Sequence, residues 1–284
     1  DIPESDYTIT LFAAEGYTPN FTYHPSNQPG AGLLDNVEQG MYQVYIVGQH
    51  AHLVLEDLRF SLPEEGLWGG HVCAGDAKGL TIRNCSFVGV DDYANAVPGV
   101  ASLLILRTPF TFHNSSIRNV EMAIEVDNDE EAVLIDSSQF ASIGYRAIGV
   151  IGQNLTVHAN QITSDSTSSA FNGISAIGAG TVSANTVTAH RGSVEGSRVA
   201  GIGVLSLDGF AGGDHGIDVY NNMISVSGTE LTFGLAVLPS SAIDHTRIVF
   251  NTVVASGTAP IHRSAALTIG REFFPGTSQQ EEEF

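Results

Sequence analysis

Residues 155–162 read Leu-Thr-Val-His-Ala-Asn-Gln-Ile, and this eight-residue pattern decides the fold. Its third and eighth positions are apolar, and its sixth is Asn or another small residue. Eight segments follow the pattern: Leu53–Phe60, Leu80–Phe87, Phe110–Ile117, Val133–Phe140, Leu155–Ile162, Gly180–Val187, Ile217–Ile224 and Thr246–Val253. Their third positions lie 22 to 37 residues apart. An imperfect period in the twenties indicates a solenoid, in which each coil buries its apolar face only by stacking on its neighbours.

A second short pattern lies between these segments. It is a Gly or Ala followed by an aliphatic residue, as in Ala147-Ile148-Gly149-Val150 and Gly201-Ile202-Gly203-Val204. Both patterns alternate with period two, as strands do. We therefore expect two strands in each coil, and each strand should lie beside its equivalent one coil further on.

The sixth position of the first pattern is Asn in four successive copies: Asn160, Asn185, Asn222 and Asn251. Asn tolerates the left-handed backbone of a sharp corner, and its amide bonds readily to a neighbouring backbone. We expect these side chains to stack inside one corner and to hold the coils in register.

Together these features resemble the parallel β-helix of pectate-lyase-like proteins and of carbohydrate-binding and sugar-hydrolase repeats. The resemblance implies an all-β, right-handed, single-stranded parallel β-helix over residues 42–271. Residues 1–41 would then form an N-terminal cap and residues 272–284 an extended tail. Because this architecture carries lyases, hydrolases, adhesins and scaffolds, function has to be argued from the site.

Charge and composition exclude several classes of function. The 284-residue chain has a net charge of −20 and 11 cationic residues, of which Lys78 is the one lysine. Binding of nucleic acid or of an anionic membrane surface calls for clustered cations, so neither is expected. No apolar run approaches the roughly 20 residues of a membrane span. The sequence begins at Asp1, so a leader has either been removed or is left out of this sequence, and the first alternative suits a secreted or cell-surface protein.

Two sets of residues bear on an extracellular location. Cys73 and Cys85 are 12 residues apart, so they form either a disulfide or two buried thiols. Four Asn-X-Ser/Thr sites permit glycosylation, at Asn20, Asn84, Asn114 and Asn154.

The fourth position of the first pattern gives a candidate substrate-binding site. Because the third position faces inward, the fourth faces outward, and four successive coils place Arg83, His113, Asp136 and His158 in one row. Such a row can bind an acidic sugar, hold a metal or perform acid–base chemistry with a His beside its Asp. The alternative is an ordinary solvated face.

A second candidate site rests on a resemblance. The segment Asn84–Asp92 is similar to the paired-aspartate segment of polygalacturonase-type glycoside hydrolases. The resemblance implies that Asp91 and Asp92 are catalytic carboxylates. It also implies a role for His113, one coil further on, and for Arg146, one coil beyond His113. His113 stands in Phe-His-Asn, however, and Ile148 takes the place of the family's lysine after Arg146.

A third candidate is a calcium site in the acidic turn after residue 126. Asp127, Asp129 and Glu131 supply carboxylate oxygens, although no recognised calcium-loop pattern surrounds them. A solvated acidic turn is the alternative, and we expect no required cofactor.

These observations favour a non-catalytic extracellular protein with a structural, self-assembling or carbohydrate-contacting function. Its partners would be copies of itself, another surface or a polysaccharide. Small outward residues in the second pattern, such as Gly149, Ser175, Gly203 and Ala236, suit the close approach of another surface. The alternative is a hydrolase or lyase that acts on an acidic polysaccharide.

Overall fold

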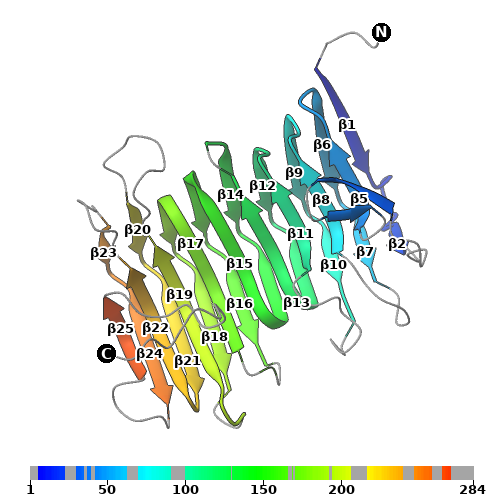
Figure 1. Cartoon of the computed structure of the whole chain (residues 1–284). Helices are drawn as coiled ribbons and strands as arrows, with labels where there is room; N and C mark the ends of the chain where they lie inside the picture. The colour runs from blue at the N-terminus through cyan, green and yellow to red at the C-terminus, as the bar shows by residue number, and fades with distance from the viewer. Residues whose placement is uncertain are drawn as a thin grey trace.

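A computed structural model describes residues 6–22, 30–34, 37–39, 42–62, 70–90, 100–128, 130–165, 168, 170–191, 194–205, 216–238, 246–257 and 264–269. Its regular elements in this part of the chain are all β-strands. The strands wind into a stack of coils, and each strand pairs in parallel with its equivalent in the next coil (Figure 1). The predicted fold class is confirmed, since this is a parallel β-helix.

Each coil has three walls, and the described residues form nine coils. Wall A contains β1 (Tyr7–Phe12), β6 (Ala51–Glu56), β9 (Gly79–Arg83), β12 (Phe110–His113), β14 (Ala132–Asp136), the end of β15 (Gln139–His158), the end of β17 (Ala170–Ser183), β20 (Ile217–Tyr220) and β23 (Ile248–Val249).

Wall B contains β2 (Asn20–Thr22), β7 (Arg59–Ser61), β10 (Ser86–Val88), the start of β13 (Ser116–Asp127), the start of β15, β16 (Gln161–Ser164), β18 (Thr186–His190), β21 (Met223–Gly228) and β24 (Thr252–Gly257). Wall C contains β5 (Tyr42–Val47), β8 (Gly70–Gly75), β11 (Ala101–Leu106), the end of β13, the middle of β15, the start of β17, β19 (Arg198–Leu205), β22 (Leu231–Leu238) and β25 (Ser264–Ile269). An antiparallel hairpin, β3 (Gly30–Leu34) and β4 (Val37–Gln39), is inserted between walls B and C of the first coil.

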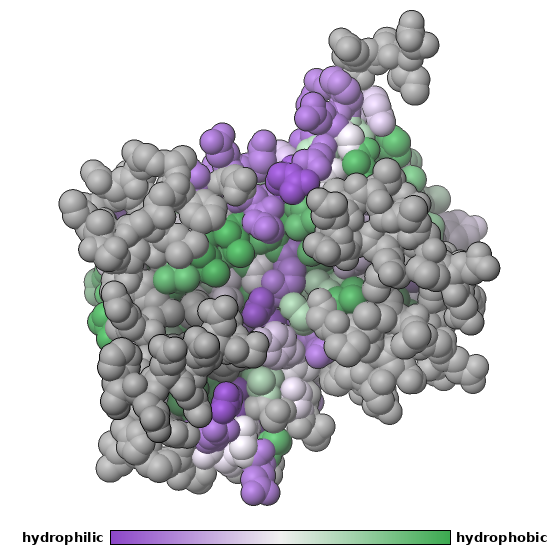
Figure 2. Space-filling view, in the orientation of Figure 1, coloured by the Kyte–Doolittle hydropathy of each residue, from purple (hydrophilic) through white to green (hydrophobic). Residues whose placement is uncertain are grey.

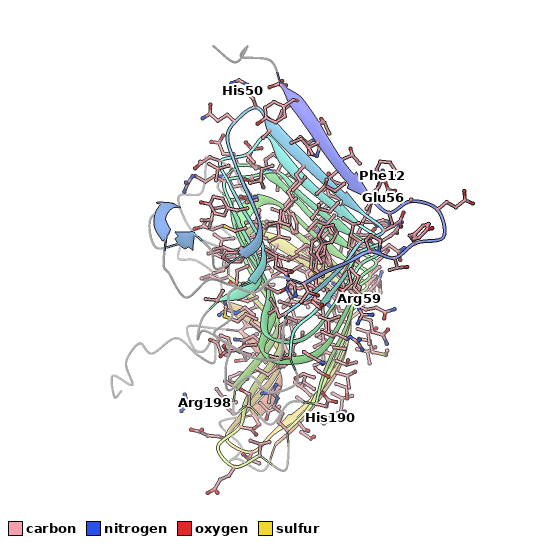
Figure 3. The ribbon with its side chains drawn as sticks, turned by 90° about the vertical axis from the view of Figure 1, so that its right-hand side faces the viewer. Phe12, His50, Glu56, Arg59, His190 and Arg198 are labelled. Atoms are coloured by element: carbon pink, nitrogen blue, oxygen red, sulfur yellow. The ribbon has the colours of Figure 1, made fainter. Side chains whose placement is uncertain are left out.

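The expectation of two strands per coil was wrong. The eight-residue pattern bends at its sixth position, so its first four residues lie in wall A and its seventh and eighth lie in wall B. Figure 3 looks along the stack from the N-terminal end. In that view His50 lies near the corner between walls C and A, and Glu56 and Arg59 lie near the corner between walls A and B.

The core consists of apolar columns that run the length of the stack. One column joins the third positions, from Leu55 through Ile82 and Phe112 to Val219, and all four of these side chains are fully buried. In wall B the rings of Phe60 and Phe87 stack with their centroids 5.0 Å apart. Burying a side chain of this size contributes about 1.5–3 kcal/mol, so the stacking of coils supplies the main stabilisation.

The corner between walls A and B contains the predicted asparagine ladder. Asn160 Nδ2 donates to Asn185 Oδ1 at 3.0 Å, Asn185 Nδ2 to Asn222 Oδ1 at 3.0 Å, and Asn222 Nδ2 to Asn251 Oδ1 at 2.9 Å. Each amide also donates to a carbonyl of the preceding coil, as Asn185 does to Val157 at 2.9 Å. Because every rung joins two coils, the ladder fixes their register.

Asparagine is favoured at this corner for its side-chain hydrogen bonds, not for a left-handed backbone as predicted. The left-handed residue is the fifth of the pattern, not the sixth, as at Asn84, Ala159 and Phe250, where φ is 55°, 53° and 55°. The sixth residue is favoured because its side chain accepts and donates inside the turn. Ser115 and Ser138 continue the same contacts in earlier coils: Ser115 N donates to Ser138 Oγ at 3.1 Å.

The corner between walls B and C has little room for side chains. A Cβ on Gly173 would lie 2.4 Å from the carbonyl oxygen of Gly201, and a Cβ on Gly201 would lie 2.5 Å from that of Gly234. The first coils place polar side chains at this column instead. His71 is fully buried there and contacts Ser102 Oγ at 2.7 Å, while Gln43 donates to the Ser61 carbonyl at 2.7 Å.

A fully buried arginine links the middle coils near this corner. Arg191 donates to the carbonyls of Gly144 and Ala170 at 2.9 and 2.8 Å, and to Ser164 Oγ at 2.7 Å. Its guanidinium also lies 5.0 Å from the centroid of the Phe171 ring. These contacts satisfy backbone carbonyls that face the inside of the turn.

The parallel pairing begins before the predicted boundary at residue 42. β1 pairs with β6 and β2 pairs with β7, so residues 7–22 belong to the first coil instead of to a separate cap. The predicted tail, residues 272–284, lies outside the described residues. The part of the chain that the structure describes has no helix with the length and apolar character needed to cross a membrane.

Candidate functional site

The predicted row on wall A is present. Arg83 lies beside His113, His113 beside Asp136, and Asp136 beside His158, in successive coils. Their side chains pair along the stack. Arg83 donates to Glu56 Oε2 at 2.7 Å, His113 Nδ1 lies 2.9 Å from Asp136 Oδ2, and His158 Nδ1 lies 2.9 Å from Ser183 Oγ.

This row is partly open to solvent. The side chains of Arg83 and His113 are each 48% exposed, whereas that of Asp136 is 21% exposed. Exposed pairs of this kind contribute about 0–1 kcal/mol each. Their geometry fits a solvated ladder as well as a binding surface, so substrate binding by these four residues stays a prediction.

Two residues of the polygalacturonase-like set, His113 and Arg146, lie on different walls. His113 lies in wall A, whereas Arg146 lies in the part of β15 that belongs to wall C. Asp91 and Asp92 lie outside the described residues. Among the residues implied by that resemblance, Arg146 is therefore separated from His113 by a corner of the coil.

The calcium candidate is only partly described. Asp127 ends β13 and Glu131 precedes β14, and both are exposed, while Asp129 lies outside the described residues. Within the described part of the chain, no three His, Cys, Asp or Glu side chains are grouped so that they can hold a metal ion.

Cys73 and Cys85 are two free, buried thiols, which was one of the two predicted alternatives. Cys73 packs beside Tyr42 on wall C, and Cys85 lies in the corner between walls A and B, so the disulfide is absent. Burial raises the pKa of Cys73 to about 12 and that of Cys85 to about 11, which makes both thiols unreactive.

All four candidate glycosylation sites have exposed asparagines: Asn20, Asn84, Asn114 and Asn154. Asn84 and Asn114 occupy the same corner of adjacent coils, where Asn114 Nδ2 donates to Asn84 Oδ1 at 2.8 Å. Attachment of glycans at these positions stays a prediction.

The outer face of wall C differs from that of wall A. The small outward residues expected to be exposed are buried, as at Ser175 (6%) and Ala236 (2%). Aliphatic residues such as Ile151 and Ile177 follow on the same face and are half-buried. Figure 2 looks onto this side of the molecule, and its coloured part shows hydrophobic and hydrophilic residues side by side.

An ion pair lies on this face. Arg146 Nη1 donates to both carboxylate oxygens of Glu125, at 3.1 and 3.0 Å, and the Arg146 and Glu125 side chains are 20% and 21% exposed. The guanidinium also lies 5.3 Å from the centroid of the Tyr145 ring. The two residues come from adjacent coils, in which Glu125 is paired with Gly149 and Arg146 with Met122.

Gly149 makes space for this pair. A Cβ at residue 149 would lie 2.5 and 2.6 Å from the two carboxylate oxygens of Glu125. Any larger residue would therefore move the carboxylate away from its place above the sheet. Because Gly149 has no side chain, the Glu125 carboxylate can lie directly above it.

Burial raises the pKa of the Glu125 carboxyl, and the neighbouring Arg146 opposes this shift. Asp127 lies two residues further along the same strand and therefore on the same face. A carboxyl with a raised pKa beside a second carboxylate is suited to acid–base chemistry.

Sequence reasoning named Arg146 but missed Glu125. Glu125 stands in another copy of the second pattern, Ala123-Ile124-Glu125-Val126. The available signal was its position: it is the acidic member of a row whose later members are Gly149, Ser175, Gly203 and Ala236.

Comparisons with known proteins give little further information. No protein-family model matches the chain, and no curated protein does. A solved structure that is similar is the A-module of the mannuronan C-5 epimerase AlgE4 from Azotobacter vinelandii. It has 10% sequence identity and a TM-score of 0.26, and the match covers 95% of this chain and 90% of that one. At this TM-score the likeness carries no argument, so function rests on the residues described above.

Proposed function

We propose that this chain is a carbohydrate-contacting β-helix protein that binds an extended polysaccharide along the outer face of wall C. We propose further that it acts outside the cell, secreted or at the cell surface. The observation that carries the first proposal is the Glu125–Arg146 pair on the outer face of wall C, which is about four-fifths buried. The exposure of all four sequon asparagines supports the second.

Arg146 has donors to offer a ligand. Its contacts to Glu125 both come from Nη1, so the Nη2 donors have no hydrogen-bond partner among the described residues. Hydroxyl and carboxylate oxygens of a sugar are acceptors that suit a guanidinium.

The repeat of the fold suits a polymer. Strands of one wall are about 4.8 Å apart, so wall C offers similar positions at regular intervals along the stack. Aliphatic side chains such as Leu104 and Ile151 provide apolar surface beside the ion pair. A sugar ring has an apolar face and a polar rim, and both find partners on such a surface.

Binding measurements on matched variants test the proposal. Calorimetric titration with soluble neutral and uronate-containing polysaccharides should detect binding to the unmodified chain. Arg146→Met should weaken binding at least tenfold, whereas Arg83→Met on wall A should leave it unchanged. Equal weakening by both variants, or no binding across the panel, would contradict the assignment to wall C.

A second candidate function is polysaccharide hydrolysis at the same face. The raised pKa of Glu125 favours it, because a protonated carboxyl can donate its proton to the glycosidic oxygen as the bond breaks. Asp127 would take a proton from the attacking water, as in inverting glycosidases. Glu125→Gln should then abolish the release of reducing ends and preserve binding. A chain that binds without releasing reducing ends has the binding function alone.

A further inference from the structure

The first coil leaves inward side chains of wall A exposed. Leu11 continues the wall A column of Leu55, and Ile9 continues that of Leu53. Leu55 is fully buried and Leu53 is 6% exposed, whereas Leu11 and Ile9 are 39% and 48% exposed. The apolar columns therefore reach the N-terminal end of the stack without a cover over these residues.

The last coil is open in the same way. Leu267 continues the wall C column of Leu235, and Ile269 continues that of Val237. Leu235 and Val237 are 1% and 4% exposed, while Leu267 and Ile269 are 47% and 63% exposed. The transfer of such apolar surface out of water is favourable, so both ends favour burial against another surface.

Each end also presents three strand edges. In the described part of the chain, β1, β2 and β5 pair on one side only, with β6, β7 and β8. At the other end, β23, β24 and β25 pair only with β20, β21 and β22. Free edges offer backbone donors and acceptors to another strand.

The two ends complement each other. Coil one begins at wall A and coil nine finishes at wall C, so the next strand beyond β25 would again belong to wall A. The chain's own repeat shows which strands would meet: β23 with β1, β24 with β2, and β25 with β5. All of these pairings would be parallel. The exposed columns of Leu11 and Phe21 would continue those of Ile248 and Val253, while Ile46, which is already buried in the first coil, lies in the column of Ile269.

We propose that the chain associates head to tail with a second copy of itself, the C-terminal coil of one copy stacking on the N-terminal coil of the next. Two copies of one end cannot meet in this way, because their strands would run in opposite directions. A head-to-tail contact between unlike surfaces does not close on itself, so it continues into filaments.

Sedimentation velocity of the full chain over a range of concentrations tests this proposal. The unmodified chain should form dimers and longer species as concentration rises. Leu11→Lys blocks the N-terminal end and Leu267→Lys blocks the C-terminal end, so each variant alone should be a monomer. Leu134→Lys is the matched control, because Leu134 is an exposed outward leucine in the middle of the stack, and it should assemble normally.

An equimolar mixture of the two blocked variants provides the sharpest result. It should form dimers and stop there, because each variant retains one intact end of the opposite kind. Far-UV circular dichroism checks that the variants are folded, and Ile9→Lys with Ile269→Lys gives a second pair. A monomeric unmodified chain, a mixture that stays monomeric, or dimers of one blocked variant alone would overturn the proposal.

Discussion

Walls A and C share one construction and differ on their outer faces. Both consist of parallel strands with buried aliphatic columns behind them. On wall A the outward residues Arg83 and His113 are about half exposed and pair with neighbours along the stack. On wall C the outward residues Ser175 and Ala236 are buried, and the pair of Glu125 and Arg146 is four-fifths buried. A row of charged and imidazole side chains on a β-helix wall therefore does not identify a site unless neighbouring residues exclude water from it.

The asparagine ladder lies at the corner of walls A and B, and its disruption should cause the greatest loss of stability. Asn185→Leu should lower the free energy of unfolding by about 4 kcal/mol, because the Asn160 amide and the Val157 carbonyl both lose their partner. Urea unfolding followed by circular dichroism measures this. The adjacent outward change Thr186→Leu should cost less than about 1 kcal/mol. Similar losses in both variants would show that the ladder has no special importance.

A buried histidine, His71, should make the stability of the fold depend on pH. Burial lowers the pKa of His71 to about 4 from an ordinary value of 6.5. Between these values the unfolded chain binds a proton that the folded chain does not, so stability should fall as pH falls from 6.5 to 4, by about 3 kcal/mol at most.

His71→Gln should remove this dependence and still fold, because Gln43 takes the equivalent place one coil earlier and bonds to the wall B carbonyl of Ser61. Urea unfolding at half-unit steps of pH measures this, and a profile unchanged by His71→Gln would be evidence against a neutral buried imidazole.

The two arginines give the next effect. Arg146→Met leaves the Glu125 carboxylate without its cation in a half-buried site, so the free energy of unfolding should fall by about 2 kcal/mol at pH 7. This loss should disappear below the ordinary carboxyl pKa of 4.5, where Glu125 is protonated in both states. Arg83→Met, which breaks an exposed pair with Glu56, should cost less than about 1 kcal/mol. Equal costs would mean that the two faces do not differ electrostatically.

The smallest expected effect is at Asp136. Asp136→Asn weakens its contact with His113 and should change stability by about 0.5 kcal/mol or less, because the His113 side chain of that pair is 48% exposed to water. Binding of polysaccharide should also be unchanged. A clear loss of binding in this variant would move the site from wall C to wall A.

The sequence was sufficient for the repeat, the register and the row on wall A, because these depend on apolar spacing and on period-two alternation. The ladder of Asn160, Asn185 and Asn222 followed from one repeated position. The third wall was missed because the bend falls inside the eight-residue pattern. Nothing in local alternation distinguishes a bent segment from a straight strand.

The candidate site was harder to predict than the fold. Whether an outward residue is buried depends on what covers the wall, and spacing along the chain does not report this. Arg146 was named for its resemblance to another family's arginine, whereas its observed partner is Glu125. Gly149 matters for the room that it leaves, which becomes visible only when adjacent coils are stacked.

Titration of the Glu125 carboxyl is the most direct test of a ligand site on wall C. Its carbon-13 resonance can be assigned by comparison with Glu125→Gln and followed with pH, with and without a short oligosaccharide from a polymer that binds. We expect the Glu125 carboxyl to have a pKa above the ordinary value of 4.5, and its resonance to shift when the oligosaccharide is added. A pKa at or below 4.5, together with a resonance that does not shift with any bound oligosaccharide, would contradict a ligand site on wall C.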